Sequence, residues 1–334
     1  MGQAWSRRVS GQGPLQRPRY VDAQEQSMLL QLPADLFVVI SHYLTPASKM
    51  ALALTSRASL DFLYDEARAE LRPSDWQHLL PLLERSVADR FFYCHFCNVL
   101  HLYDPAWRPG SVLGPSSCKN KQNFAPSSGF HIEYHHARLA MNAQLFGADR
   151  GLPLERFNQQ RSVYNGNASW TQHWTAKVVD DELLLCCVHT LAQGCKTGQV
   201  FRDAMKTGSY EICHHLGVHQ GAQMQLKYPR IAHPDITYPI IVSKNQAQRA
   251  HGSCDVCLTD YKTVVEWRGS EYGIRGGWSL IVTSYHQLGG CRSSYDPTWQ
   301  AFAVERVRGR ASPRNQALHP NGVVRGRWER SCDT

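Results

Sequence analysis

The sequence predicts an α+β protein, in which a small N-terminal helical bundle precedes a β-rich, mainly antiparallel domain. Helix start signals and apolar residues at helical spacing are concentrated before Cys94. After Cys94, short apolar segments alternate with Gly, Pro, Asn and Ser, a pattern typical of strands and turns. The 334 residues suffice for one large domain or two smaller ones, and 43% of them are hydrophobic, so a sizeable core can form.

The helical bundle is predicted at residues 28–68, after a leader of residues 1–27 that is rich in Gly, Gln, Arg and Pro and is expected to be flexible. Pro33 is predicted to open the first helix, because the first helical N–H has no intrahelical partner and proline lacks that group. Thr45 and Pro46 repeat such a start signal, and two more short helices follow. Apolar residues share one face of the first helix, at Leu36, Ile40, Tyr43 and Leu44.

The β-rich domain is predicted at residues 69–305. Ser74 is expected to cap a helix that leads into Cys94, and HHARLAMNAQLFG is predicted to be a helix that ends near Gly147. The Gly-rich segment EWRGSEYGIRGGW indicates a hairpin between two strands. Five apolar segments are predicted to be strands, namely WTQHWTAKVV, ELLLCCVHTL, TYPIIV, YKTVVEW and WSLIVTSYH.

The chain is basic, with a net charge of +8 and a pI near 8.9, and part of this excess lies at its ends. Residues 306–334 are expected to be a basic, disordered tail. Arginine-rich ends can bind nucleic acid or anionic membrane. Because Trp328 is the only aromatic residue among the tail arginines, base stacking is not expected, and nucleic acid is not the favoured partner. The arginines are Arg7, Arg8, Arg17 and Arg19 in the leader, and Arg306, Arg308, Arg310, Arg314, Arg325, Arg327 and Arg330 in the tail.

No apolar signal segment opens the sequence, and no apolar run reaches the roughly 18 residues of a membrane-spanning helix. We therefore expect a cytoplasmic or nuclear protein whose 11 cysteines are reduced thiols or metal ligands. Gly2 in MGQAWS matches the N-myristoylation pattern, with Arg7 and Arg8 as a second membrane signal. The alternative is an ordinary flexible leader, and membrane binding is expected only if Gly2 is acylated.

Two pairs of cysteines have the spacing C-x-x-C, Cys94 with Cys97 and Cys254 with Cys257. Such a turn aims two sulfurs at one point, as a tetrahedral zinc ion requires of neighbouring ligands. For the first pair, His101 and Cys118 are the further candidates. Cys118 lies in the polar segment GPSSCKNKQ, where core packing does not account for a cysteine.

For the second pair, the segment ICHHLG offers Cys213 together with either His214 or His215, and the spacing alone does not choose between the two histidines. A redox C-x-x-C normally precedes a helix in a βαβ context, and neither pair does. Unliganded buried thiols remain the alternative at each site. The apolar strand cysteines, Cys186, Cys187 and Cys195, are interpreted as small hydrophobic residues, and His173, His189, His219 and His233 as core or surface residues rather than ligands.

The sequence has no pattern of a catalytic zinc site, such as H-E-x-x-H, and neither G-x-S-x-G nor a phosphate-binding glycine loop. We therefore predict no enzyme and no catalytic residue. Sites made of several thiolates are structural, so zinc is expected to staple the β-rich domain and to supply part of its folding energy.

The residues from about Leu29 to Trp299 resemble a large group of filamentous-fungal F-box proteins. The helical unit carries Leu32-Pro33, the apolar ladder and the run LALTS, and four further motifs are similar to those of the group, namely YCHFCNVLHLYDP, HARLAMN, ICHHLG and CDVCLTDY. The ending WSLIVTSYHQLGGCRSSYDPTW also resembles their closing segment. In the group's usual form of ICHHLG, the histidine corresponds to His215.

This resemblance implies an F-box adaptor. Such a protein docks a Skp-type adaptor of a cullin ubiquitin ligase, and the rest of the chain selects a protein substrate that the resemblance does not identify. The residues implied at the docking surface are Leu32, Pro33, Leu36, Ile40 and Leu44. Lys49 and Met50 depart from the pair of leucines common at their positions. The alternative is a zinc-stapled protein that binds nucleic acid or anionic membrane through its basic termini, without a ligase role.

Overall fold

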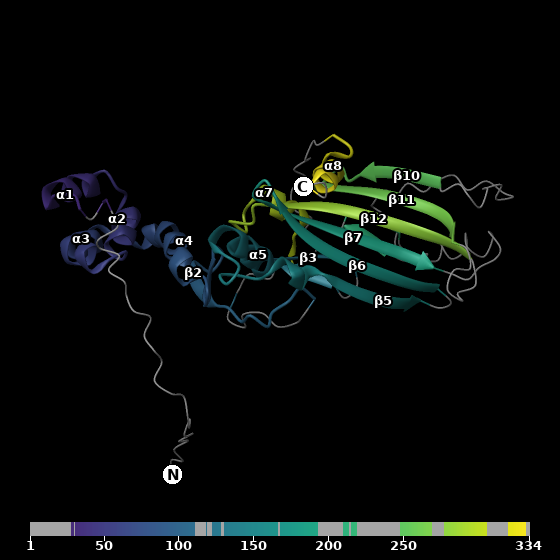
Figure 1. The fold of residues 1–334 in the computed structure, drawn as a ribbon, viewed down its shortest axis with the longest axis horizontal. Coiled ribbons are helices and arrows are strands. Elements are labelled where there is room, and N and C mark those ends of the chain that lie inside the picture. The colour runs from purple at the N-terminus through teal and green to yellow at the C-terminus, as the bar shows by residue number, and fades with distance from the viewer. Residues whose placement is uncertain are drawn as a thin grey trace, which may run out of the picture. The chain divides into compact units, whose positions relative to one another are not determined.

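The computed structural model describes residues 28–29, 31–110, 118, 122–127, 130–165, 168–192, 210–213, 215–218, 248–268, 277–305 and 320–331. The chain divides into two compact units, Met1–Leu79 and Leu80–Thr334. We call them the helical unit and the sheet unit (Figure 1). The leader, residues 1–27 with Gly2, lies outside the described residues.

The helical unit contains three α-helices, α1 (Ala34–His42), α2 (Pro46–Ala53) and α3 (Arg57–Glu70), followed by the short 3-10 helix η2 (Pro73–Asp75). The predicted start of α2 is confirmed, because the Thr45 hydroxyl accepts the N–H of Ser48 and proline follows at the first position. Ser56 caps α3 in the same way. Pro33 precedes α1 as its N-cap residue instead of occupying the first helical position.

The core of the helical unit is small. Phe37, Ala53 and Leu63 form its buried apolar cluster, and Leu52 packs against them. Lys49 lies at a position where the resemblance leads one to expect leucine, and its side chain is buried. Its ammonium group binds the carboxylates of Glu66 and Glu70, each at 2.9 Å, on the next helix.

Helix α4 (Trp76–Val87) follows η2 and continues the chain into the sheet unit. Ser74 therefore lies within η2, two residues before α4, and does not cap it directly. The apolar residues Leu79, Leu80 and Leu83 recur along α4 as predicted, and Pro81 lies inside the helix. Leu79 is fully buried and Leu80 half-buried.

The sheet unit is built on six antiparallel strands in the spatial order β10-β11-β12-β7-β6-β5 (Figure 1). Their bounds are β5 Gln159–Asn165, β6 Ala168–Val179, β7 Glu182–Ala192, β10 Gln248–Ser253, β11 Thr259–Arg268 and β12 Gly277–Gly289. Four of the five predicted strands thus exist. The fifth, TYPIIV, lies outside the described residues. The predicted hairpin is confirmed by the antiparallel pairing of β11 with β12.

The described residues also form three smaller sheets. They are the hairpin β1 (Phe91–Cys94) with β2 (Val99–Leu102), the hairpin β8 (Tyr210–Cys213) with β9 (Leu216–Val218), and a sheet of order β13-β3-β4 with β3 Gln122–Ser127, β4 Phe130–Glu133 and β13 Val304–Glu305. Every strand pair among the described residues is antiparallel. The α+β class with mainly antiparallel sheets is therefore confirmed.

Helices cover both faces of the six-stranded sheet. The helix predicted near Gly147 is α5 (Tyr134–Phe146), with Gly147 at its C-cap, and it joins the larger core together with α7 (Pro297–Phe302) and the turn η3 (Leu154–Phe157). In that core the rings of Phe130 and Trp174 stack with centroids 4.1 Å apart. Alternate residues of β7 face opposite sides, because Leu183 and Leu185 join the larger core and Leu184 and Cys186 join a second cluster.

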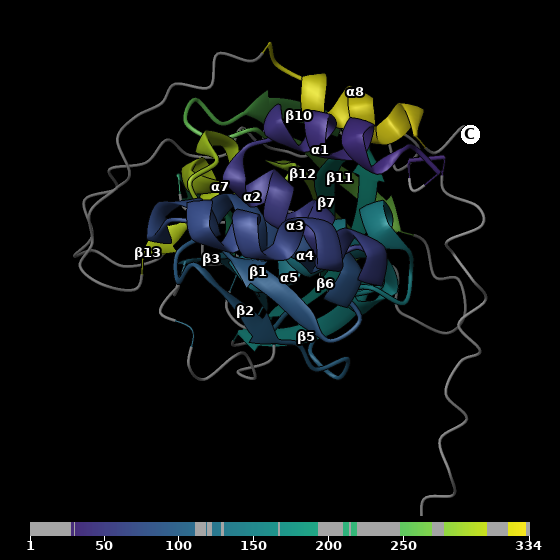
Figure 2. The same ribbon diagram turned by 90° about the vertical axis from the view of Figure 1, so that its left-hand side faces the viewer.

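The second cluster corrects the prediction of a wholly disordered tail. Residues Val323–Arg330 form helix α8, which lies against β11, β12 and β6 (Figures 1 and 2). Val324 and Trp328 of α8 are buried against Leu184, Cys186 and Tyr285 of the sheet. Residues 306–319 lie outside the described residues. Val324 and Trp328 are spaced by about one helical turn, so they form an apolar face on α8 that packs on the sheet. The basic composition of the segment does not reveal this face.

Among the described residues, no helix combines the length and the apolar character that crossing a membrane requires.

Candidate metal centres

The first candidate centre is built on the hairpin of β1 and β2, in which Cys94 lies opposite Val99. The C-x-x-C turn closes this hairpin. Within the turn Asn98 has a φ of 53°, a left-handed conformation that asparagine tolerates well, and its N–H donates to the Cys94 carbonyl at 2.8 Å. The Tyr93 hydroxyl donates to the side-chain oxygen of Asn98 at 3.1 Å. These two hydrogen bonds fix the conformation of the turn.

The ligand atoms of Cys94, Cys97, His101 and Cys118 all lie within 4.8 Å of one another. The sulfur of Cys118 is 3.7 Å from that of Cys94 and 3.8 Å from that of Cys97. Nε2 of His101 is buried and has no hydrogen-bond partner among the described residues, a state that fits a nitrogen prepared for a metal ion. The hydrogen bond with Cys118 lowers the pKa of Cys94 to about 5 against the opposing effect of burial, and thiolate is the form that binds metals.

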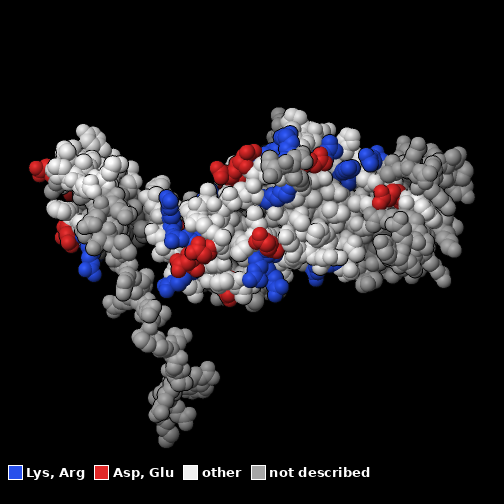
Figure 3. All heavy atoms as spheres, viewed as in Figure 1, with Lys and Arg blue, Asp and Glu red and all other residues white. Residues whose placement is uncertain are grey.

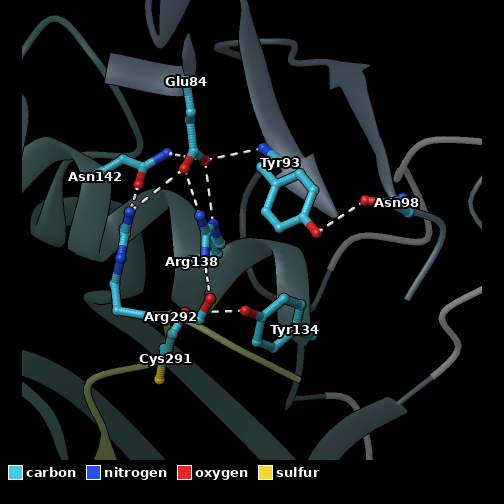
Figure 4. Close-up of polar contacts among 8 residues, drawn as sticks. All are labelled: Glu84, Tyr93, Asn98, Tyr134, Arg138, Asn142, Cys291 and Arg292. Carbon is cyan, nitrogen blue, oxygen red and sulfur yellow. Dashed lines mark hydrogen bonds and ion pairs between the residues drawn. The ribbon is translucent and has the colours of Figure 1, made fainter. Parts of the chain in front are cut away.

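A buried polar network holds this hairpin from behind (Figure 4). The Glu84 carboxylate of α4 accepts the backbone N–H of Tyr93 at 2.9 Å, the side-chain amide of Asn142 at 2.8 Å and Nε of Arg138 at 3.1 Å. A second short contact joins Arg138 to the other carboxylate oxygen of Glu84. Arg292 donates to Asn142 at 2.6 Å and closes the ring of contacts. Because Tyr93 directly precedes Cys94, the network fixes the strand that carries this ligand.

Glu84 and Arg138 form an ion pair inside the protein, since neither side chain reaches solvent, whereas the side chain of Arg292 is 36% exposed. Burial by itself raises the pKa of the Glu84 carboxyl. The charge of Arg138 and the hydrogen bonds from Arg138, Asn142 and Tyr93 more than offset this, so the pKa lies below its usual range. Glu84 is therefore ionised at neutral pH and depends on its partners.

The second candidate centre joins two hairpins that are distant in the sequence. Cys213 and His215 lie where β8 turns into β9, and Cys254 and Cys257 lie in the turn between β10 and β11. Their four ligand atoms also lie within 4.8 Å of one another, and the sulfur of Cys213 is 3.9 Å from Nδ1 of His215. The sulfur of Cys254 accepts the backbone N–H groups of Val256 and Cys257 at 3.4 and 3.5 Å.

Burial and hydrogen bonding shift the pKa values of the three cysteines in the second centre in different directions. Hydrogen bonds with Cys213 and Cys257 lower the pKa of Cys254, while burial raises the pKa values of Cys213 and Cys257. One negative charge is thus favoured among three clustered sulfurs. A divalent cation at their centre would stabilise the remaining thiolates.

A chain of hydrogen bonds leads from Cys257 to buried groups behind the second centre. Its sulfur is 3.2 Å from the Thr259 hydroxyl, which is 3.0 Å from Nδ1 of His286, and Nε2 of His286 is 3.0 Å from the Ser284 hydroxyl. Burial lowers the pKa of His286 to about 3, so its imidazole is neutral. If the Thr259 hydroxyl donates to a Cys257 thiolate, then Nδ1–H of His286 donates to the Thr259 hydroxyl, and the Ser284 hydroxyl donates to Nε2 of His286. Such outer partners orient a metal ligand.

The distances fit a tetrahedral ion. A zinc–sulfur distance of about 2.3 Å separates two sulfurs of a regular tetrahedral site by about 3.8 Å. The sulfur separations of 3.7 and 3.8 Å in the first centre agree with this value. Both centres can therefore hold a metal ion such as zinc. With four protein donors, each would leave no coordination position for a substrate, which is typical of structural sites.

The structure brings together all eight residues predicted as metal ligands, four in each centre. His215 is the histidine of the second centre, and His214 lies outside the described residues. Cys186 and Cys187 are buried as expected, His189 is buried and His173 is exposed. Cys195, His219 and His233 lie outside the described residues. None of the described cysteines forms a disulfide.

Two supporting features were not predicted from the sequence. Glu84 follows Leu80 by four residues on the apolar side of α4, and a charge at such a position is a signal of buried pairing. The partner Arg138 gives no such signal, because every residue from Tyr134 to Asn142 is buried and α5 has no polar face there. Thr259 and His286 also could not be connected to Cys257, because strand pairing alone brings them together.

Comparison with known proteins found no match. No family model, no curated protein and no solved structure matches the chain.

Proposed function

We propose that this chain is a non-enzymatic F-box adaptor. Its helical unit would dock a Skp-type adaptor of a cullin ubiquitin ligase, and its sheet unit, stapled by two structural zinc ions, would present a surface to a protein substrate. No catalytic residue is proposed, since each metal centre has a full set of protein donors. The expected location remains cytoplasmic or nuclear.

One observation on helix α1 carries the docking proposal. The helix buries Phe37 and Ser41, which are four residues apart, and exposes an apolar stripe on its other side. The stripe has the i, i+3, i+4, i+7 spacing that normally marks a buried helix face. Its members are Leu36, Val39, Ile40 and Tyr43, with 51%, 51%, 37% and 87% of their surfaces exposed. An exposed apolar face of this kind favours a protein partner.

The other residues that the resemblance assigns to the docking surface are consistent with this face. Pro33 is exposed, and Leu32 and Leu44 are half-buried. The predicted surface therefore stays accessible over its whole length among the described residues. The departure at Lys49 does not disturb it, because the Lys49 side chain points into the unit and pairs with Glu66 and Glu70.

The zinc proposal rests on the two clusters of four. Each joins a C-x-x-C hairpin to another segment, through Cys118 in the first cluster and through Cys213 and His215 in the second, so an ion would cross-link parts of the chain that secondary structure alone leaves apart. This role suits a domain in which small hairpins must be held against a larger sheet.

The alternative, a nucleic-acid or membrane partner for the basic ends, receives less support. Arg327 pairs with Asp180 and with Glu182 of the sheet, and Arg325 lies 4.0 Å from Glu329. These charges are therefore partly compensated within the chain. On the face drawn in Figure 3, basic and acidic side chains are interspersed over the sheet unit. Gly2, on which membrane attachment depends, lies outside the described residues.

Co-purification tests the docking proposal. The full chain is expected to capture a purified Skp-type adaptor, and the double variant Leu36→Asp, Ile40→Asp is expected to lose capture, since two charges would enter an apolar interface. Both side chains are exposed, so the double variant should keep its circular dichroism spectrum and its melting temperature.

The control is Phe62→Asp, which puts a single aspartate on an apolar residue of α3 that is 58% exposed and lies outside the stripe. It is expected to retain capture. Equal loss in both variants would show that general stickiness, and not the α1 stripe, causes the binding. Absence of capture by the unmodified chain would reject the adaptor function.

A further inference from the structure

The C-terminal helix α8 is held on the sheet at three places. Its buried residues Val324 and Trp328 pack on the sheet face, and the Lys177 ammonium lies 4.8 Å from the centre of the Trp328 ring. Farther along the helix, Arg327 pairs with Asp180, in the turn between β6 and β7, and with Glu182 at the start of β7. The third attachment is at its N-terminal end and has a different character.

That third attachment is Asp260. Its carboxylate accepts the backbone N–H of Gly322 at 3.2 Å and that of Arg325 at 2.9 Å. These are N–H groups that the first turn of a helix leaves without intrahelical partners, so Asp260 caps α8 from another element of the fold. Its side chain is buried at the start of β11 and also accepts the hydroxyl of Ser253.

Asp260 and Ser253 are opposite each other in the β10–β11 hairpin, and the segment between them is the turn that carries Cys254 and Cys257. Within the turn, the N–H of Cys254 donates to the Thr259 carbonyl at 2.8 Å and that of Thr259 donates to the Cys257 carbonyl at 2.7 Å. The conformation of the turn thus determines the position of Asp260.

The same turn touches the cluster under α8. Leu258, next to Cys257, packs against both the larger core and the residues beneath α8. Its carbonyl also accepts the N–H of Gln287 in β12 at 3.0 Å. Two connections therefore run from the second metal centre to α8, one polar through Asp260 and one apolar through Leu258.

We propose that the second metal centre controls the docking of α8, so that the helix leaves the sheet when this centre loses its ion. The inference rests on the proposed filling of the second centre by zinc, and it is independent of adaptor binding. Without an ion, the clustered sulfurs of the turn lose the charge that holds them together. The turn relaxes, Asp260 shifts, and the N-terminal end of α8 loses its cap.

The first centre provides the matched comparison, because none of its ligands lies in the β10–β11 hairpin. A Cys97→Ser chain is expected to lose the ion of the first centre and to retain one ion, counted by native mass spectrometry. Its peptide 320–331 should exchange amide hydrogen for deuterium as slowly as that of the unmodified chain. Removing the remaining ion with a chelator should then speed exchange in this peptide by about tenfold or more, ahead of β6 and β7.

Three results would overturn the proposal. The first is unchanged exchange in residues 320–331 after the last ion has left. The second is exchange that rises only together with that of β6 and β7, because such a rise reports global unfolding. The third is a Cys97→Ser chain that binds no ion, because the second centre would then hold no metal; this result would not bear on capture of the adaptor by the helical unit.

A variant away from the ligands tests the Asp260 connection directly. Asp260→Asn keeps the size of the side chain but removes its charge and replaces one of its two accepting oxygens by an amide donor, so exchange in residues 320–331 should rise about fivefold while both ions are retained. Asp255→Asn is the control, since Asp255 is an exposed residue of the same turn and should leave exchange unchanged. Unchanged exchange in Asp260→Asn would contradict the inference. Alkylation of Cys186, buried beneath α8, provides a second readout that should follow the exchange rates.

Discussion

The two units of this protein use their apolar and polar residues in opposite ways. The helical unit buries only a small apolar cluster and leaves a stripe of large apolar side chains on its surface. The sheet unit buries most of its large apolar side chains among the described residues, and it also buries cysteines, histidines and a charged network. The first unit is therefore organised around what it exposes, and the second around what it encloses.

This difference predicts that substitutions in the two units have different consequences. Changes on the helical stripe should alter partner binding and leave folding intact, since the side chains concerned contribute little to the core. Changes in the enclosed polar groups of the sheet unit should destabilise it strongly, because a buried group that loses its partner retains the cost of leaving water.

Metal removal is expected to have the largest effect and would test this contrast most severely. Structural zinc sites contribute on the order of 10 kcal/mol in small zinc-dependent domains. A strong chelator should therefore lower the melting temperature of the sheet unit by more than any substitution below, while the melting of the helical unit stays unchanged. Thermal denaturation followed by near-ultraviolet and far-ultraviolet circular dichroism measures the two effects separately. An unchanged melting curve after complete metal loss would contradict the structural role.

The substitution Glu84→Gln is expected to have the next largest effect. It leaves the Arg138 guanidinium buried without its carboxylate, and breaking a buried pair in this way costs about 3–5 kcal/mol. Urea unfolding of the full chain measures the loss. Glu155→Gln, at an exposed position, is the matched control and should change stability by less than about 0.5 kcal/mol. Equal stability of the two variants would show that the network is dispensable.

The same carboxylate predicts an acid sensitivity of the sheet unit. The pKa of Glu84 is lower in the folded protein than its ordinary value of 4.5. Its ionised form therefore stabilises the folded state fully above the unfolded-state value, and this contribution is lost as the pH falls through the folded-state pKa. The difference in unfolding free energy between the unmodified chain and Glu84→Gln should therefore shrink as the pH falls below this range. A constant difference would assign the effect to packing instead of charge.

The smallest effect is expected for Lys49→Met in the helical unit. Methionine can fill the buried space of the lysine stem, and the partners Glu66 and Glu70 are partly exposed, so water can replace the lost ion pair. The hydrogen bonds that Lys49 donates to Glu70 and Glu66 raise the pKa of Lys49, so these ion pairs stabilise the fold at neutral pH and are lost as the pH rises past that pKa. The unfolding midpoint at neutral pH should shift much less than in Glu84→Gln. A shift of the unfolding midpoint as large as that of Glu84→Gln would show that buried charges matter equally in the two units.

Much of the local structure follows from the sequence because neighbouring residues decide it. The C-x-x-C spacing, the Thr45 cap and the Gly-rich connection between β11 and β12 act over a few residues, and all three features appear as predicted. The alternating apolar strands also follow from local pattern. Most of the two ligand sets could also be predicted, because core packing seldom accounts for cysteines in polar or turn segments, whereas metal binding does. The choice of His215 over His214 needed the family resemblance, since spacing alone leaves it open.

What only the tertiary structure decided is which distant residues meet. The approach of Cys213 to Cys254, the burial of Glu84 with Arg138, and the capping of α8 by Asp260 each join segments separated by tens of residues. Composition alone predicts a disordered tail, yet Val324 and Trp328 find a sheet face to cover. Local pattern fixes the conformation of a turn or helix, but pairings across the fold depend on sheet order, which no short stretch of residues encodes.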